Sequence, residues 1–121
     1  MAITKQTVKK LSGFNIADAN TKAPADVSCS AGTDYYFDLT NLADEKVVFE
    51  ITNSGASKLT LTVYKGDGVQ AVEDATLEIP ASETHILQFE SAKFKILKGE
   101  AKGCLKLKCS ASATIRAFSL R

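Results

Sequence analysis

Apolar and polar residues alternate with a period of two along most of the chain after Lys46. In the run from Lys46 to Asn53, Val47, Phe49 and Ile51 share one side. Successive side chains of a strand point to opposite faces of a sheet, whereas an amphipathic helix repeats its apolar residues every three or four positions. This run therefore predicts a strand that buries one face.

The same alternation predicts further strands along the chain. They are expected over Asp34–Leu39, Ser57–Tyr64, Ala75–Ile79, His85–Phe89, Lys93–Ile96, Cys104–Cys109 and Ala113–Leu120. Turn-forming sequences separate them at Asn53–Ser57, Lys65–Gly68 and Gly99–Gly103. We expect the glycines of Lys65–Gly68 to supply the positive φ angles of a hairpin turn. Pro80 lacks a backbone donor and is expected to end the strand before it.

Short strands about every ten residues, with turns between them, are typical of an all-β fold. The sequence predicts an antiparallel β-sandwich, immunoglobulin-like or jelly-roll-like, over residues 34–121. Residues 1–33 are expected to form a partly irregular N-terminal arm of the same globular unit. Within it, Ile3–Leu11 fits a strand, a helix or an extended arm, which is either a partly ordered terminus or one that orders on a neighbouring subunit.

Basic residues are concentrated in the last quarter of the chain. Residues 93–121 hold eight Lys and Arg against one acid, although the net charge of all 121 residues is only +1. If Lys93–Ile96 and Cys104–Cys109 pair as a hairpin, four lysines project from one of its faces: Lys93, Lys95, Lys106 and Lys108.

Three interpretations of this lysine face stay open. It could bind nucleic acid, although it lacks the interleaved aromatic residues on which bases stack. It could keep an exposed hairpin from aggregating. It could also dock on an acidic surface, including a neighbouring copy of the same protein. Of the three, nucleic acid binding is the one that we expect least.

Several apolar residues fall on the strand faces assigned to solvent: Val48, Ile86, Phe118 and Leu120. A second packed sheet or a contact between proteins would cover them equally well. The candidate interaction surface therefore combines the lysine face (Lys93, Lys95, Lys106 and Lys108) with Phe118 and Leu120.

The residues that usually carry catalysis are few and scattered. Cys104 is expected on the lysine face, where neighbouring cations could lower its pKa and give a reactive thiol, and Cys109 on the buried face with Leu107. The single histidine, His85, falls on the side of Leu87 and is expected at the rim of the core. We therefore expect no catalytic residues, no metal ligands and no cofactor.

The composition is that of a soluble globular domain, with 45% hydrophobic and 24% charged residues. No run approaches the roughly 20 apolar residues of a membrane span, so we expect no membrane partner. The N-terminal residues lack the apolar core of a secretory signal, which predicts synthesis in a cytoplasm.

From Val47 to Arg121 the order of elements resembles a family of small phage structural proteins, the capsid decoration or head auxiliary type. The matching segments are Ile51–Ala56, Leu59–Val63, Ile79–Thr84 and Ile115–Arg121. The chain has Ser82 where a glycine is frequent in that family, and its Asp67–Asp74 segment has no counterpart there.

The resemblance implies a non-enzymatic structural protein that docks on the capsid lattice and stabilises the shell. Its partners would be the major capsid protein or another virion protein, and a small homo-oligomer is also compatible. The protein would be synthesised in the host cytoplasm and located in the virion. The alternative is a ligand- or carbohydrate-binding immunoglobulin-like module of a tail fibre or surface protein. For that alternative the plausible aromatic platforms are Tyr35, Tyr36 and Tyr64.

Overall fold

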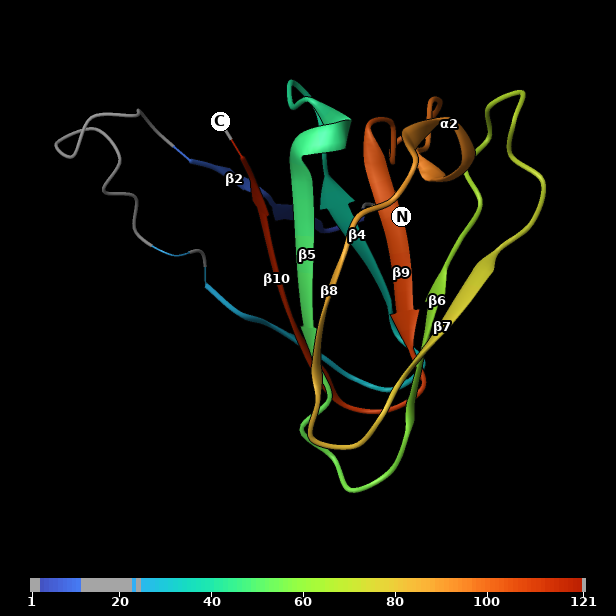
Figure 1. The fold of residues 1–121 in the computed structure, drawn as a ribbon. Helices are drawn as coiled ribbons and strands as arrows, with labels where there is room; N and C mark the ends of the chain where they lie inside the picture. The colour runs from blue at the N-terminus through green and yellow to red at the C-terminus, as the bar shows by residue number, and fades with distance from the viewer. Residues whose placement is uncertain (1–2, 12–22, 24, 121) are drawn as a thin grey trace, which may run out of the picture.

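The chain folds into two mixed β-sheets with almost no helix (Figure 1). A computed structural model describes residues 3–11, 23 and 25–120. Sheet A has the order β1 (Lys5–Thr7), β4 (Asp34–Asp38), β9 (Cys104–Cys109), β6 (Leu59–Val63) and β7 (Ala75–Ile79). Sheet B has the order β2 (Lys9–Lys10), β10 (Ala113–Ser119), β5 (Val47–Thr52) and β8 (Thr84–Leu87), and β3 (Val27–Cys29) also pairs with β10. Two short helices, η1 (Asp44–Lys46) and α2 (Ser91–Phe94), complete the described elements.

The predicted alternation of buried and exposed residues is confirmed in the strands that carry it most clearly. Leu59, Leu61 and Val63 of β6 are fully buried, and the residues between them are partly exposed. The rings of Phe37 from sheet A and Phe49 from sheet B meet edge to face, with their centroids 5.4 Å apart. The apolar core therefore lies between the inner faces of the two sheets.

The N-terminal segment belongs to both sheets. β1 pairs with β4 and β2 pairs with β10, and both pairings are parallel. Val8, between the two strands, is 7% exposed, so the chain crosses from sheet A to sheet B over the core. The expectation of purely antiparallel sheets is therefore wrong at these two pairs. Within each pair the two strands are far enough apart in sequence for the chain to return in the parallel direction.

Three of the strands, β1, β2 and β3, come from the segment that the sequence assigned to an arm. Ile3–Leu11, for which the pattern left several structures open, contains β1 and β2. Residues 12–22 of the expected arm lie outside the described residues, as does Pro24.

The predicted strand Lys93–Ile96 is wrong. Ser91–Phe94 instead forms one helical turn, and only Lys95 makes a bridge to β9, opposite Leu105. The carbonyl of Lys93 accepts a hydrogen bond of 2.8 Å from the N–H of Gly66. The backbone of this segment therefore contacts both the connection between β6 and β7 and the strand β9.

Gly66 and Gly68 do not form the tight turn that the sequence predicts. The connection is a long loop from Tyr64 to Asp74, and neither glycine has a positive φ. Gly66 is required for space instead, because a Cβ there would fall onto the carbonyl of Lys95.

At the end of the molecule away from α2 and the β6–β7 loop, the side chain of Asn53 links the turns by hydrogen bonds. Asn53 is 1% exposed. Its side-chain Nδ2 donates to the carbonyls of Ser57 at 2.8 Å and Ile79 at 3.0 Å, and its Oδ1 accepts from the N–H of Gly55 at 3.0 Å. The turn predicted at Asn53–Ser57 is confirmed, and so is the end of β7 at the residue before Pro80. We call this the closed end, and the end that carries α2 and the β6–β7 loop the open end (Figure 1).

Candidate binding surfaces

The four lysines predicted on one hairpin face are dispersed over the molecule. Lys93 lies on α2, where its Nζ is 3.7 Å from a carboxylate oxygen of Glu90. Lys95 forms an ion pair of 3.0 Å with Asp44, and only 18% and 22% of the two side chains are exposed. The expectation of a single lysine face is therefore wrong, because the segment before Ile96 is not a strand of the hairpin.

Lys106 and Lys108 do share a face, the outer face of sheet A, where tyrosines accompany them. Lys106 Nζ lies 4.4 Å from the ring centroid of Tyr64 and 5.6 Å from that of Tyr36. Lys108 Nζ lies 5.7 Å from the centroid of Tyr64. Asp34 accepts a hydrogen bond of 2.9 Å from the Tyr64 hydroxyl and lies 3.5 Å from Lys106 Nζ. These residues form a tyrosine–lysine cluster that spans β4, β9 and β6.

The neighbours of Lys106 stabilise its charged form. Partial burial alone would lower the pKa of Lys106, but the charge of Asp34 and the adjacent Tyr36 raise it above its ordinary value. Tyr35 does not join the cluster, because its hydroxyl accepts a hydrogen bond of 2.8 Å from the N–H of Ser30 and its ring packs against the core. Of the three tyrosines considered as platforms, two therefore share one face.

The outer face of sheet B carries the apolar residues that the sequence placed on the solvent side. Phe118 on β10 lies directly opposite Val48 on β5, and Ile86 on β8 lies opposite Glu50, the residue of β5 two positions beyond Val48. Ile86 is 68% exposed and Leu120 is 44% exposed. We call Val48, Ile86, Phe118 and Leu120 the apolar strip. The second sheet does not cover it, because sheet A packs on the other face.

All three cysteines are free and buried. Burial raises the pKa of Cys104, and the charges of Lys5 and Lys95 only partly oppose this effect. The lysines near Cys104 therefore do not lower its pKa, because desolvation of the thiolate outweighs their charges. Cys109 lies in the core as predicted, and there it contacts Cys29, whose pKa is raised by that thiol neighbour and by burial.

His85 lies where the sequence placed it, at the rim of the core beside Leu87. Its side chain is 34% exposed, and its Nε2 lies 3.0 Å from a carboxylate oxygen of Glu83. Within the described residues no group of three His, Cys, Asp or Glu side chains could hold a metal ion.

A pocket of about 510 Å³ at the open end collects lysines that the sequence gave no reason to combine. Lys5 from β1, Lys95 before β9 and Lys102 in the following turn line it. Its remaining lining residues are Thr40, Asn41, Ile96, Leu97 and Gly103. We call it the lysine pocket.

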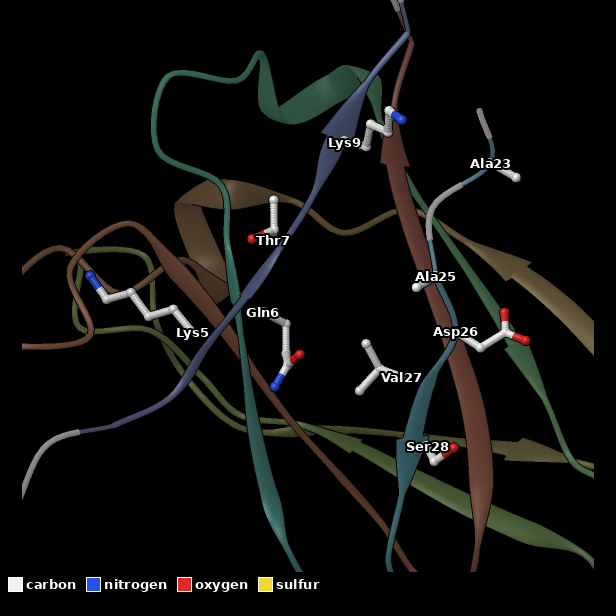
Figure 2. Close-up of a pocket in the computed structure, with 9 residues that line it drawn as sticks. All are labelled: Lys5, Gln6, Thr7, Lys9, Ala23, Ala25, Asp26, Val27 and Ser28. Atoms are coloured by element: carbon white, nitrogen blue, oxygen red, sulfur yellow. The ribbon is translucent and has the colours of Figure 1, made fainter. Parts of the chain in front are cut away.

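A second hollow, of about 690 Å³, separates the N-terminal strands from β3 (Figure 2). Gln6 and Val27 project into the space between the strands in this view, and Asp26 points away from it (Figure 2), toward its ion pair of 2.9 Å with Arg116. The rest of its lining is Lys5, Thr7, Lys9, Ala23, Ala25 and Ser28.

The described part of the chain contains no helix that is long and apolar enough to cross a membrane. Comparisons with protein-family models, with curated proteins and with solved structures give no match to this chain.

Proposed function

We propose that this chain is a non-enzymatic structural protein of a phage virion, which docks on the capsid lattice and stabilises the shell. The observation that supports this most directly is the apolar strip on the outer face of sheet B. Ile86 and Leu120 are exposed, and the partly exposed Val48 and Phe118 lie between them. A continuous apolar strip of this kind on the surface of a small protein is typical of contact sites for other proteins. Arg116, which pairs with Asp26 and lies opposite Glu50, supplies the polar rim that such sites have.

The fold suits a docking role. In this proposal the two sheets form an immunoglobulin-like or jelly-roll-like β-sandwich, whose packed core presents the apolar strip on a fixed surface. A capsid repeats the same site many times, so the partner is the major capsid protein or another virion protein of the shell. Binding to the assembled shell and not to its dissociated subunits stabilises the shell by mass action.

Co-sedimentation with expanded, DNA-free shells of the source phage tests this proposal at low and moderate salt. We expect saturable binding at a fixed ratio to the major capsid protein. The variant Ile86→Ser/Leu120→Ser should weaken binding about ten-fold or more, because it removes two apolar side chains whose burial in a contact is favourable.

The matched control is Thr62→Ala/Thr76→Ala, a cross-strand pair on β6 and β7 of sheet A. This variant should bind shells as the unmodified chain does. The absence of binding at both salt concentrations would contradict the proposal.

A second candidate function is carbohydrate binding, which the tyrosine–lysine cluster favours. Tyr36 and Tyr64 lie on one face with Asp34 and Lys106. Such a combination of aromatic and hydrogen-bonding side chains is suited to binding a sugar. Lys106 already covers one side of the Tyr64 ring, which leaves less ring surface for a sugar. Specific binding on a glycan array, lost in Tyr36→Ala/Tyr64→Ala, would favour this function over shell docking.

A further inference from the structure

The β6–β7 loop at the open end exposes apolar side chains at its tip. Val69 is fully exposed and Val72 is 76% exposed. Solvent-exposed loops are usually built from polar residues, glycine and proline, so two exposed valines in one loop offer apolar surface for a contact with another protein.

The base of this loop is held in place by hydrogen bonds. The N–H of Gly66 donates to the carbonyl of Lys93 at 2.8 Å, and Asp67 Oδ1 accepts from the N–H of Leu97 at 2.6 Å. Asp74 Oδ1 accepts from the N–H of Lys65 at 2.8 Å. The loop therefore presents its tip on a fixed base, which lowers the entropy cost of binding through that tip.

The lysine pocket offers positive charge and an apolar side chain to a binding partner. Lys95 is neutralised by Asp44, whereas no carboxylate among the described residues forms an ion pair with Lys5 or Lys102. Leu97, which is 50% exposed, gives the pocket an apolar side. An occupant that combines apolar groups with one or two carboxylates would suit it.

The loop has that composition. Residues 65–74 contain one lysine and three acids, Asp67, Glu73 and Asp74, besides the two valines. Asp67 and Asp74 already accept hydrogen bonds from the N–H groups of Leu97 and Lys65, whereas Glu73 is exposed. We propose that two copies of this chain pair end to end, with the tip of each loop in the lysine pocket of the other copy.

A two-fold arrangement follows from the position of Leu97. Leu97 lines the lysine pocket, and its N–H binds Asp67 at the base of the loop, so the loop and the pocket are neighbours at one end of the molecule. A two-fold axis at that end makes both loop–pocket contacts at once and closes the assembly at two copies. Val69 and Val72 would then cover Leu97 of the other copy, and Glu73 would face its Lys5 and Lys102.

A second copy suits the pocket better than nucleic acid does. Asp38 stays ionised beside the pocket, since hydrogen bonds with the hydroxyl and the N–H of Thr40 lower its pKa. Together with Asp44 it offsets much of the positive charge, whereas a nucleic acid site needs an excess of it.

Sedimentation velocity and light scattering over a concentration series test the pairing without any capsid shell, so the result is independent of the proposed shell binding. We expect a concentration-dependent species of twice the chain mass. The loop variant Val69→Ser/Val72→Ser and the pocket variant Lys5→Gln/Lys102→Gln should each raise the dissociation constant about ten-fold or more. The control variant Lys10→Gln/Lys58→Gln removes the same charge elsewhere and should leave it within about two-fold.

Mixing the two damaged variants is the decisive step. A loop variant paired with a pocket variant retains one intact loop–pocket contact, whereas each variant alone retains none. Association that returns only in the mixture would therefore establish the contact. A monomer at all concentrations, a larger ring, or a mixture no better than its separate components would overturn the proposal. Circular dichroism of each variant confirms that it remains folded.

Discussion

The closed and open ends of this molecule are built in opposite ways. At the closed end, the buried side chain of Asn53 binds the carbonyls of Ser57 and Ile79, so the polar groups of two turns satisfy one another. At the open end, two valines of the β6–β7 loop are exposed and two lysines of the lysine pocket lack an ion-pair partner among the described residues. Both ends join the same two sheets, so the difference lies in the connections.

This difference separates stability from recognition. A buried, fully hydrogen-bonded side chain stabilises a fold because its partners would otherwise be left without hydrogen bonds. Exposed apolar and charged side chains contribute little to folding and remain available for a partner. Substitutions at the closed end should therefore change mainly the free energy of unfolding, and those at the tip of the open end mainly association.

The largest expected effect is that of Asn53→Ala. The substitution removes the hydrogen bonds to the carbonyls of Ser57 and Ile79 and leaves both inside the closed end. We expect the free energy of unfolding to fall by about 2–4 kcal/mol, as for other buried polar groups that lose their partner. Urea denaturation measures this change. Ser54→Ala, at an exposed position of the same turn, should change it by less than about 0.5 kcal/mol. Similar losses in both variants would show that Asn53 does not hold the closed end together.

Gly66→Ala should have the next largest effect, at the base of the open end. A Cβ at residue 66 would collide with the backbone carbonyl of Lys95, which cannot move without shifting the bridge to β9. We expect a loss of about 1–3 kcal/mol, typical of overpacking, with faster proteolysis in the β6–β7 loop.

Gly68→Ala is the matched control in the same loop. There the nearest atom to a Cβ is the flexible Cδ1 of Leu97, at 3.3 Å, so the free energy of unfolding should change much less. Equal losses in the two variants would mean that the loop base is not fixed by its contact with Lys95.

Thiol labelling should separate the outer face of sheet A from the core. Cys104 is also buried, but it lies on the side of β9 that carries Lys106, with Lys5 and Lys95 close enough for their charges to act on it, whereas Cys29 and Cys109 lie between the sheets. Side-chain motion can therefore expose Cys104, but the other two thiols require the sheets to separate. With a thiol reagent at neutral pH we expect one thiol to react about ten-fold faster than the others, and all three to react more slowly than in urea. In Cys104→Ser the fastest native phase should be missing; its persistence would contradict this assignment.

The alternation of residue types was sufficient to predict most strands. It predicts β5, β6 and β7 because each has one face in the core, and the side of each residue follows from its position in the run. It failed at Lys93–Ile96, where four residues are too few to separate a strand from one turn of helix. The segment also makes a contact that the local pattern cannot reveal, because Lys93 accepts a hydrogen bond from Gly66, which is far away in sequence.

The candidate binding surfaces were harder to predict from the sequence than the strands were. The apolar strip could be anticipated, since Val48 and Phe118 stand out on polar faces. The lysine pocket could not, because Lys5 and Lys102 come from opposite ends of the chain and meet only through the parallel pairing of β1 with β4. The tyrosine–lysine cluster likewise depends on the register that places Tyr36 opposite Lys106.

The smallest expected effect compares two strained residues, one at each end. Ser82 at the closed end has φ = 63° and Asn41 at the open end has φ = 66°. In this left-handed region a side chain costs about 1 kcal/mol, which glycine avoids, although glycine also makes the unfolded chain more flexible. Asn tolerates the region better than Ser does. We expect Ser82→Gly to raise the free energy of unfolding by about 0.5 kcal/mol, or about 2 °C in Tm, and Asn41→Gly to change it less. Thermal denaturation of the two variants side by side measures the difference. A larger gain at Asn41 would indicate that the open end stores more backbone strain than the closed end, contrary to what the two residue types predict at these similar angles.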